Sequence, residues 1–127
     1  MLKETNAEEF KSPSAGAHES ESNRVLVCAR CKRLIARRRD QVAVNGSHVH
    51  TFVNPDNETF MIGCFGDAPG LIRVSPATLS DTWFAGYSWQ GESCGGCRMF
   101  LGWLYRQGDH RFHGLILAGL NEIDEQP

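Results

Sequence analysis

The sequence predicts a single, mainly β domain built from antiparallel strands. Short runs of β-branched and aromatic residues recur along the chain, with turn signals between them. No segment shows the long apolar period of an amphipathic helix. A chain of 127 residues, 41% of them hydrophobic, supports one modest core. We therefore expect one small β domain.

The domain is expected to span residues 24–121. The preceding segment, residues 1–23, is polar, with too little apolar surface to fold, and is expected to be disordered. Residues 122–127 are expected to form a C-terminal tail. The strands expected from the residue pattern are, in order, Arg24–Cys28, Leu34–Ile35, Val42–Val44, His48–Val53, Thr59–Phe65, Leu71–Val74, Trp83–Trp89, Met99–Arg106 and Phe112–Leu117.

Four of the five cysteines form two Cys-x-x-Cys pairs, Cys28 with Cys31 and Cys94 with Cys97. Two such pairs complete the tetrahedral four-thiolate set that Zn²⁺ takes in structural sites, and such a site has no open position for chemistry. The 62 residues between Cys31 and Cys94 far exceed the roughly 15–20 of a simple zinc ribbon. We therefore predict one structural zinc ion that joins two distant hairpins.

Two disulfide-based interpretations of the cysteines have less support. Redox disulfides of the thioredoxin type would accompany a βαβ pattern, which the sequence lacks. Structural disulfides would accompany secretion, but Met1–Phe10 has no apolar run typical of a signal peptide. We therefore expect a cytoplasmic protein with reduced thiols. The fifth cysteine, Cys64, lies in the apolar run Phe60–Phe65 and is expected to be a buried hydrophobe.

Charge and hydropathy argue against two classes of partner. The net charge of −2 gives no electrostatic basis for nucleic-acid binding. The basic triplet Arg37–Arg39 is better explained as a solvated turn. No stretch approaches the roughly 18 apolar residues of a membrane span. His48 and His50 alternate in one expected strand and are expected to be surface or hydrogen-bonded residues. We expect a monomer that binds neither nucleic acid nor membrane.

All three tryptophans and both tyrosines fall between positions 83 and 105. Gly86 lies in the middle of the segment 83–89, where a tight turn would direct Trp83 and Trp89 toward a common space. In the following strand, alternation places one set of side chains on a single face. That set is Met99, Leu101, Trp103 and Tyr105. The clustering favours a partly open aromatic pocket over a closed core.

An aromatic pocket has two common uses, and the composition does not choose between them. The rings can hold a cation against their faces, in which case Asp81 or Glu92 could assist. Alternatively they can sandwich a flat neutral ring whose edge meets backbone donors and acceptors.

Several motifs together resemble the thalidomide-binding (CULT) domain of cereblon. They are Cys28–Cys31, Phe52–Pro55, Thr82–Trp89 (TWFAGYSW), Cys94–Cys97, Leu101–Trp103 and Phe112–Ile116. The match covers roughly Val25 to Leu120 and is similar to the stand-alone bacterial members of that family. The resemblance implies a β-tent fold of two antiparallel sheets pinned by zinc. It also implies a pocket for cyclic imides such as glutarimide and for uracil-like rings, and C-terminal cyclic imides of damaged proteins are further candidate ligands.

The resemblance also implies roles for individual residues. Trp83, Trp89 and Trp103 match the three walls of the aromatic cage. Asn54 and Pro55 match a loop that borders the pocket, and Phe60 and Tyr105 fall where bacterial members close it. The imide edge would be held by backbone groups of Asp81 and Trp83. The human protein has a histidine at the position of Asp81, and a common proline of the turn is replaced by Ala85.

The expected function is therefore a small-ligand binding module with no catalytic residue. One alternative is an enzyme similar to the zinc-bearing methionine sulfoxide reductases, which need a reactive cysteine outside the zinc set. Only Cys64 is spare for that role, and an apolar setting blunts a thiol. The chain could also be a zinc-ribbon-like protein or nucleic-acid interaction module that uses Arg37–Arg39, or a reader of methylated ammonium groups.

Overall fold

The computed structural model describes residues 23–125. The expected disordered segment, residues 1–23, thus lies outside the described residues except for Asn23, as do residues 126 and 127. Two short 3-10 turns, η3 (Arg38–Asp40) and η4 (Leu117–Gly119), accompany the strands. The strands are β1 (Arg24–Cys28), β2 (Leu34–Arg37), β3 (Val49–Val53), β4 (Thr59–Phe65), β5 (Leu71–Arg73), β6 (Ser88–Cys94), β7 (Phe100–Gln107), β8 (His110–Ile116) and β9 (Leu120–Asp124).

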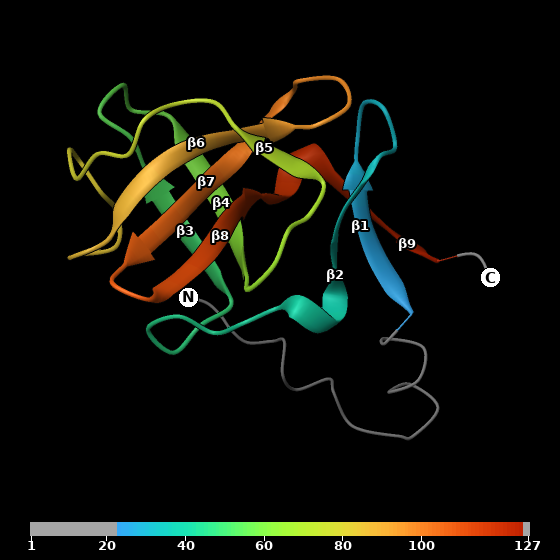
Figure 1. Ribbon diagram of the computed structural model, residues 1–127, viewed down its shortest axis with the longest axis horizontal. Helices are drawn as coiled ribbons and strands as arrows, with labels where there is room; N and C mark the ends of the chain where they lie inside the picture. Colours follow the sequence, from blue (N-terminus) through green and yellow to red (C-terminus); the bar gives the residue numbers. More distant parts are fainter. Residues whose placement is uncertain (1–22, 126–127) are drawn as a thin grey trace.

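The strands form two antiparallel sheets, which confirms the expected mainly β fold. A small sheet has the order β2-β1-β9, and a large sheet has the order β3-β4-β8-β7-β6-β5. The small sheet lies at one end of the large one, and the β1–β2 and β6–β7 loops approach each other there (Figure 1). Within residues 23–125, no helix is long and apolar enough to cross a membrane.

The large sheet has a hydrophobic cluster on each face. One cluster joins the two sheets and includes Leu26, Phe65 and Leu115. The other includes Cys64 and Phe112 and is extended by the aromatic residues of the 83–89 segment. Neighbouring strand residues such as Cys64 and Phe65 enter different clusters because successive side chains point to opposite faces. The second cluster therefore provides a buried base for the aromatic segment.

Two expected strands are replaced by turns. Within residues 42–44 only Val44 forms a β-bridge, an isolated one with Ser47 across a turn at Asn45, which has a φ of 53°. In the aromatic segment only Ser88 and Trp89 belong to a strand. Gly86 has a φ of 87°, and the Thr82 hydroxyl donates to the Tyr87 carbonyl at 2.7 Å, which closes the segment into a loop. The expected turn at Gly86 is present, and it interrupts the strand.

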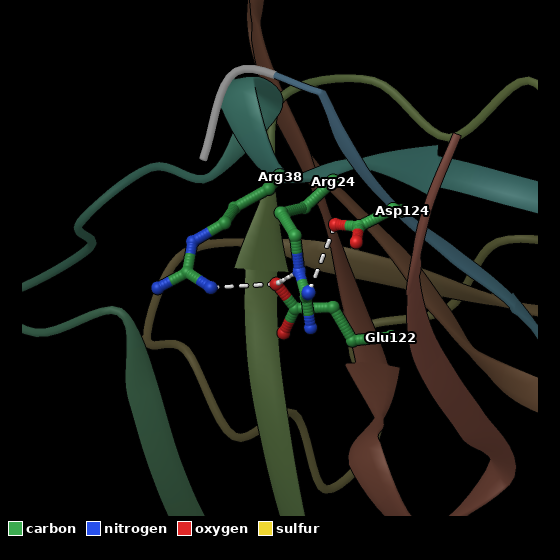
Figure 2. A network of polar contacts seen from close by, with 4 residues as sticks. All are labelled: Arg24, Arg38, Glu122 and Asp124. Carbon is green, nitrogen blue, oxygen red and sulfur yellow. Dashed lines mark hydrogen bonds and ion pairs between the residues drawn. The ribbon is translucent and has the colours of Figure 1, made fainter. Parts of the chain in front are cut away.

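β9 is absent from the strands predicted by the sequence and runs beyond residue 121, the expected end of the domain. It pairs with β1 along five residues. Arg24 forms ion pairs with Glu122 at 3.2 Å and Asp124 at 3.0 Å, and Arg38 reaches the same Glu122 carboxylate (Figure 2). Cross-strand charge pairs of this kind stabilise a sheet edge modestly. Residues 122–124 are thus part of the small sheet.

A register shift in β6–β7 changes the expected alternation in β7. Glu92 pairs with Gly102 while Ser93 pairs with Phe100, so Leu101 is the extra residue of a bulge. Leu101 packs in the cluster between the sheets, whereas Trp103 and Tyr105 pack on the other face. The predicted common face therefore holds for the two aromatic residues but is wrong for Leu101, and Met99 also packs against the inter-sheet cluster.

Candidate functional site

The four paired cysteines meet where the two sheets join. Cys28 ends β1 and Cys94 ends β6, so each pair begins at the last residue of a strand. The Sγ atoms of Cys28 and Cys97 are 3.6 Å apart, and those of Cys31 and Cys94 are 3.4 Å apart. All four sulfur atoms lie within 4.8 Å of one another. The predicted set is therefore brought together as expected.

The two Cys-x-x-Cys turns have the same backbone geometry. In the first, Cys28 N donates to Arg33 O, and Lys32 N to Cys28 O. In the second, Cys94 N donates to Met99 O, and Arg98 N to Cys94 O. The residue after each second cysteine is left-handed, with φ of 70° at Lys32 and 71° at Arg98. Neither position is Gly or Asn, so the residue types there do not indicate the left-handed conformation.

This cluster fits a tetrahedral zinc ion. With Zn–S bonds of about 2.3 Å, tetrahedral geometry places the sulfur atoms about 3.8 Å apart, close to the observed spacing. The backbone N–H of Met99 lowers the pKa of Cys97 to about 6, which favours the thiolate that binds metal. Arg30, which donates to the Cys97 carbonyl at 3.1 Å, adds a positive charge beside the cluster. A metal there would hold the sheets together and leave no open position for a substrate.

Cys64 has the surroundings expected of a core residue. Its side chain is fully buried on β4, and burial raises the pKa of the thiol to about 12. A thiol with so little thiolate at neutral pH is a poor nucleophile.

The second predicted constellation forms a cavity of about 280 Å³ on the face of the large sheet away from the small sheet. Its walls come from the β3–β4 turn, the β5–β6 loop and the strands β6 and β7. The lining residues are Asn54, Pro55, Asp81, Trp83, Trp89, Trp103 and Tyr105. Seven of the eight predicted ligand-binding residues therefore line one cavity, and its volume is at the small end of ligand pockets.

Three indole rings wall the cavity, and each is fixed by its surroundings. Trp83 and Trp103 meet nearly edge to face, with ring centroids 4.9 Å apart and planes at 72°. Phe52 stacks on Trp83 with centroids 4.8 Å apart. The Trp89 indole N–H donates to the Ser80 carbonyl at 2.8 Å, which ties this ring to the β5–β6 loop. All three rings remain partly exposed, as an open cage requires.

The segment Asp81–Trp83 presents free backbone groups beside these rings. Asp81 has a left-handed φ of 55°, and the Thr82 N–H donates to Leu79 O. Within residues 23–125, neither the Asp81 carbonyl nor the Trp83 N–H has a protein hydrogen-bond partner. One backbone acceptor and one backbone donor are thus available at two cavity-lining residues.

Three predicted pocket residues lie differently from expectation. Phe60 does not line the cavity but packs against Trp83 and Trp103, at centroid distances of 5.9 and 5.5 Å. Tyr105, expected where the pocket closes, is only 2% exposed and forms part of its base. Glu92, a candidate partner for a bound cation, is buried against His113, away from the cavity lining.

Comparisons with known proteins support the fold. The sequence matches no protein-family model and no curated protein. Among solved structures, the chain is similar to one described as the crystal structure of the Mis18 "Yippee-like" domain. The TM-score is 0.56 at 13% sequence identity, covering 82% of this chain and 98% of that one. A likeness at this identity shows a shared fold and carries no function across.

Proposed function

We propose that this protein is a cereblon-like (CULT-type) binding module. In this proposal one structural zinc ion on Cys28, Cys31, Cys94 and Cys97 fixes the fold. The aromatic cavity then binds a small, flat, neutral ring with an imide edge, of the glutarimide or uracil type. The module performs no reaction of its own.

One observation carries the proposal: three tryptophans wall a cavity whose Asp81–Trp83 segment has a backbone C=O and a backbone N–H with no partner among residues 23–125. An imide offers the complementary pair, an N–H donor beside a carbonyl acceptor. Backbone groups suit a neutral ligand because no charge has to be desolvated. Ring faces of Trp supply most of the contact area.

The expected affinity follows from ligand size. A glutarimide has about eight heavy atoms, and small ligands rarely gain more than roughly 1–1.5 kcal/mol per atom. A binding free energy of about −6 to −8 kcal/mol, or tens of micromolar to micromolar, is the corresponding range.

The competing functions have less support. A reductase would need Cys64 as nucleophile, and its burial and raised pKa oppose that role. A nucleic-acid surface would need the basic triplet, but Arg37 pairs with Glu125 and Arg38 with Glu122. A reader of methylated ammonium would rely on Asp81, since Glu92 lies elsewhere. One peripheral carboxylate gives such a site little charge complementarity.

A side-by-side titration tests the choice of ligand class. Glutarimide and uracil are expected to quench Trp fluorescence saturably, with little change between low and physiological salt, because neither ligand is charged. Trimethyl-lysine is expected to bind at least about tenfold more weakly, a difference of about 1.4 kcal/mol. Tighter binding of trimethyl-lysine, weakened by added salt, would instead identify a cation cage.

A further inference from the structure

A second cavity, of about 400 Å³, lies on the opposite face of the large sheet and is lined from β5, β6 and β8. In contrast to the aromatic cavity, its lining is mostly charged or polar. The lining residues are Asp67, Ala68, Leu71, Ile72, Arg73, Glu92, Arg111 and His113. None of these residues lines the aromatic cavity, so the two sites are separate.

A buried His–Glu pair forms part of this lining. His113 Nδ1 and Glu92 Oε1 are 2.7 Å apart, and the two residues are only 8% and 3% exposed. They lie on β8 and β6, with β7 between them. Glu92 is paired with Gly102 of β7, where the missing side chain leaves room for contact across the strand. A Cβ at Gly102 would lie 2.1 Å from the Gly114 carbonyl oxygen, so the backbones also approach closely.

Both members of the pair keep unused hydrogen-bonding atoms. Within residues 23–125, His113 Nε2 and the second carboxylate oxygen of Glu92 have no protein partner. Buried polar atoms of native proteins are nearly always hydrogen-bonded to protein, water or a ligand. A polar group in the cavity would therefore satisfy atoms that the described residues leave unpaired.

Two guanidinium groups, those of Arg73 and Arg111, line the same cavity. Arg73 is paired with Glu92 in the β5–β6 register but makes no ion pair in the described part of the chain, and the same holds for Arg111. Asp67 is the only other acidic residue of the lining. The two arginines balance the two acids of the lining, and since His113 binds one oxygen of Glu92, the guanidinium N–H donors remain available to a ligand. A metal site is disfavoured, because the cysteine cluster is the only metal-ligand group found in residues 23–125.

We propose that this second cavity binds a small molecule through an oxyanion, a carboxylate or a phosphate, with Arg73 and Arg111 as the anion-binding residues. Guanidinium groups suit both anions because they offer paired N–H donors. The His113–Glu92 pair then hydrogen-bonds a polar group beside the anion. This inference does not depend on the ligand proposed for the aromatic cavity.

An NMR titration at constant ionic strength tests the site. Inorganic phosphate, and acetate in a parallel series, replace chloride while the imidazole signals of His113 are followed. A saturable shift in the millimolar range is expected with at least one of the two anions. Arg73→Gln and Arg111→Gln are each expected to weaken binding by about tenfold, because a hydrogen bond to a charged group is lost.

Two controls make the result decisive. Arg39→Gln removes the same charge outside the cavity and is expected to leave the titration unchanged. Trp83→Ala should likewise leave the anion titration unchanged. The anion site is therefore tested independently of the aromatic cavity. Both arginines are exposed, so their variants should fold. If neither anion saturates the His113 shift, or if Arg73→Gln and Arg111→Gln behave like Arg39→Gln, the proposal is wrong.

Discussion

Removing the metal is expected to unfold the domain. The cysteine cluster joins the ends of β1 and β6, and Cys28 and Cys94 are fully buried within the inter-sheet core. Structural zinc contributes about 10–16 kcal/mol in small zinc domains, as much as the whole stability of an ordinary domain of about 5–15 kcal/mol. Chelation, or the change Cys94→Ser, should abolish the cooperative thermal transition seen by circular dichroism.

Elemental analysis of the folded protein is expected to find one zinc ion per chain. Cys64→Ala is the control, because it removes a cysteine outside the cluster and should leave the zinc content unchanged. A folded, untreated protein with far less than one zinc per chain would contradict the prediction. So would a Cys94→Ser variant with an unaltered melting temperature.

Replacing any one cage tryptophan by alanine is expected to weaken imide binding by at least about 30-fold. Each ring supplies one wall of a cavity of about 280 Å³. The loss of one ring face should cost about 2 kcal/mol or more, which is about 30-fold in affinity. From a parent Kd of micromolar to tens of micromolar, such a loss leaves a Kd of about 30 μM to about 1 mM. Isothermal titration calorimetry of Trp83→Ala, Trp89→Ala and Trp103→Ala with glutarimide measures it.

Phe100→Ala is the matched control. Its ring is 43% exposed, contacts Trp103 but does not line the cavity. This variant should bind within about threefold of the parent, which is less than 1 kcal/mol. All variants should keep their zinc and a cooperative thermal transition. Cage variants that bind glutarimide like the parent would refute the assignment of the cage.

The sequence predicts the parts of the site whose chemistry requires particular residue types. Paired cysteines can be recognised at any separation, since tetrahedral zinc takes four thiolates wherever they occur in the chain. The Gly86 turn is predictable because a left-handed residue there favours glycine. The turn at Gly86, together with the β6–β7 pairing that sets Trp89 opposite Tyr105, brings Trp83 and Trp89 toward Trp103.

Features set by tertiary context could not be predicted. The bulge at Leu101 depends on the register of β6 against β7, and a shift of one residue changes which face a side chain occupies. β9 is mostly polar (LNEID), so its pairing with β1 has little hydrophobic signature in the sequence. The His113–Glu92 contact crosses an intervening strand, and no local pattern indicates it. The aromatic site was therefore accessible from the sequence, whereas the polar cavity was not.

The most direct test of the imide proposal compares glutarimide with its N-methyl derivative on the zinc-loaded protein. Methylation removes the N–H donor and adds bulk where the Asp81 carbonyl is expected to accept, while leaving the ring faces almost unchanged. Calorimetry should show micromolar to tens-of-micromolar binding of glutarimide and no measurable binding of the N-methyl compound. Equal binding of the two compounds would show that the imide edge is not recognised and would contradict the proposed function.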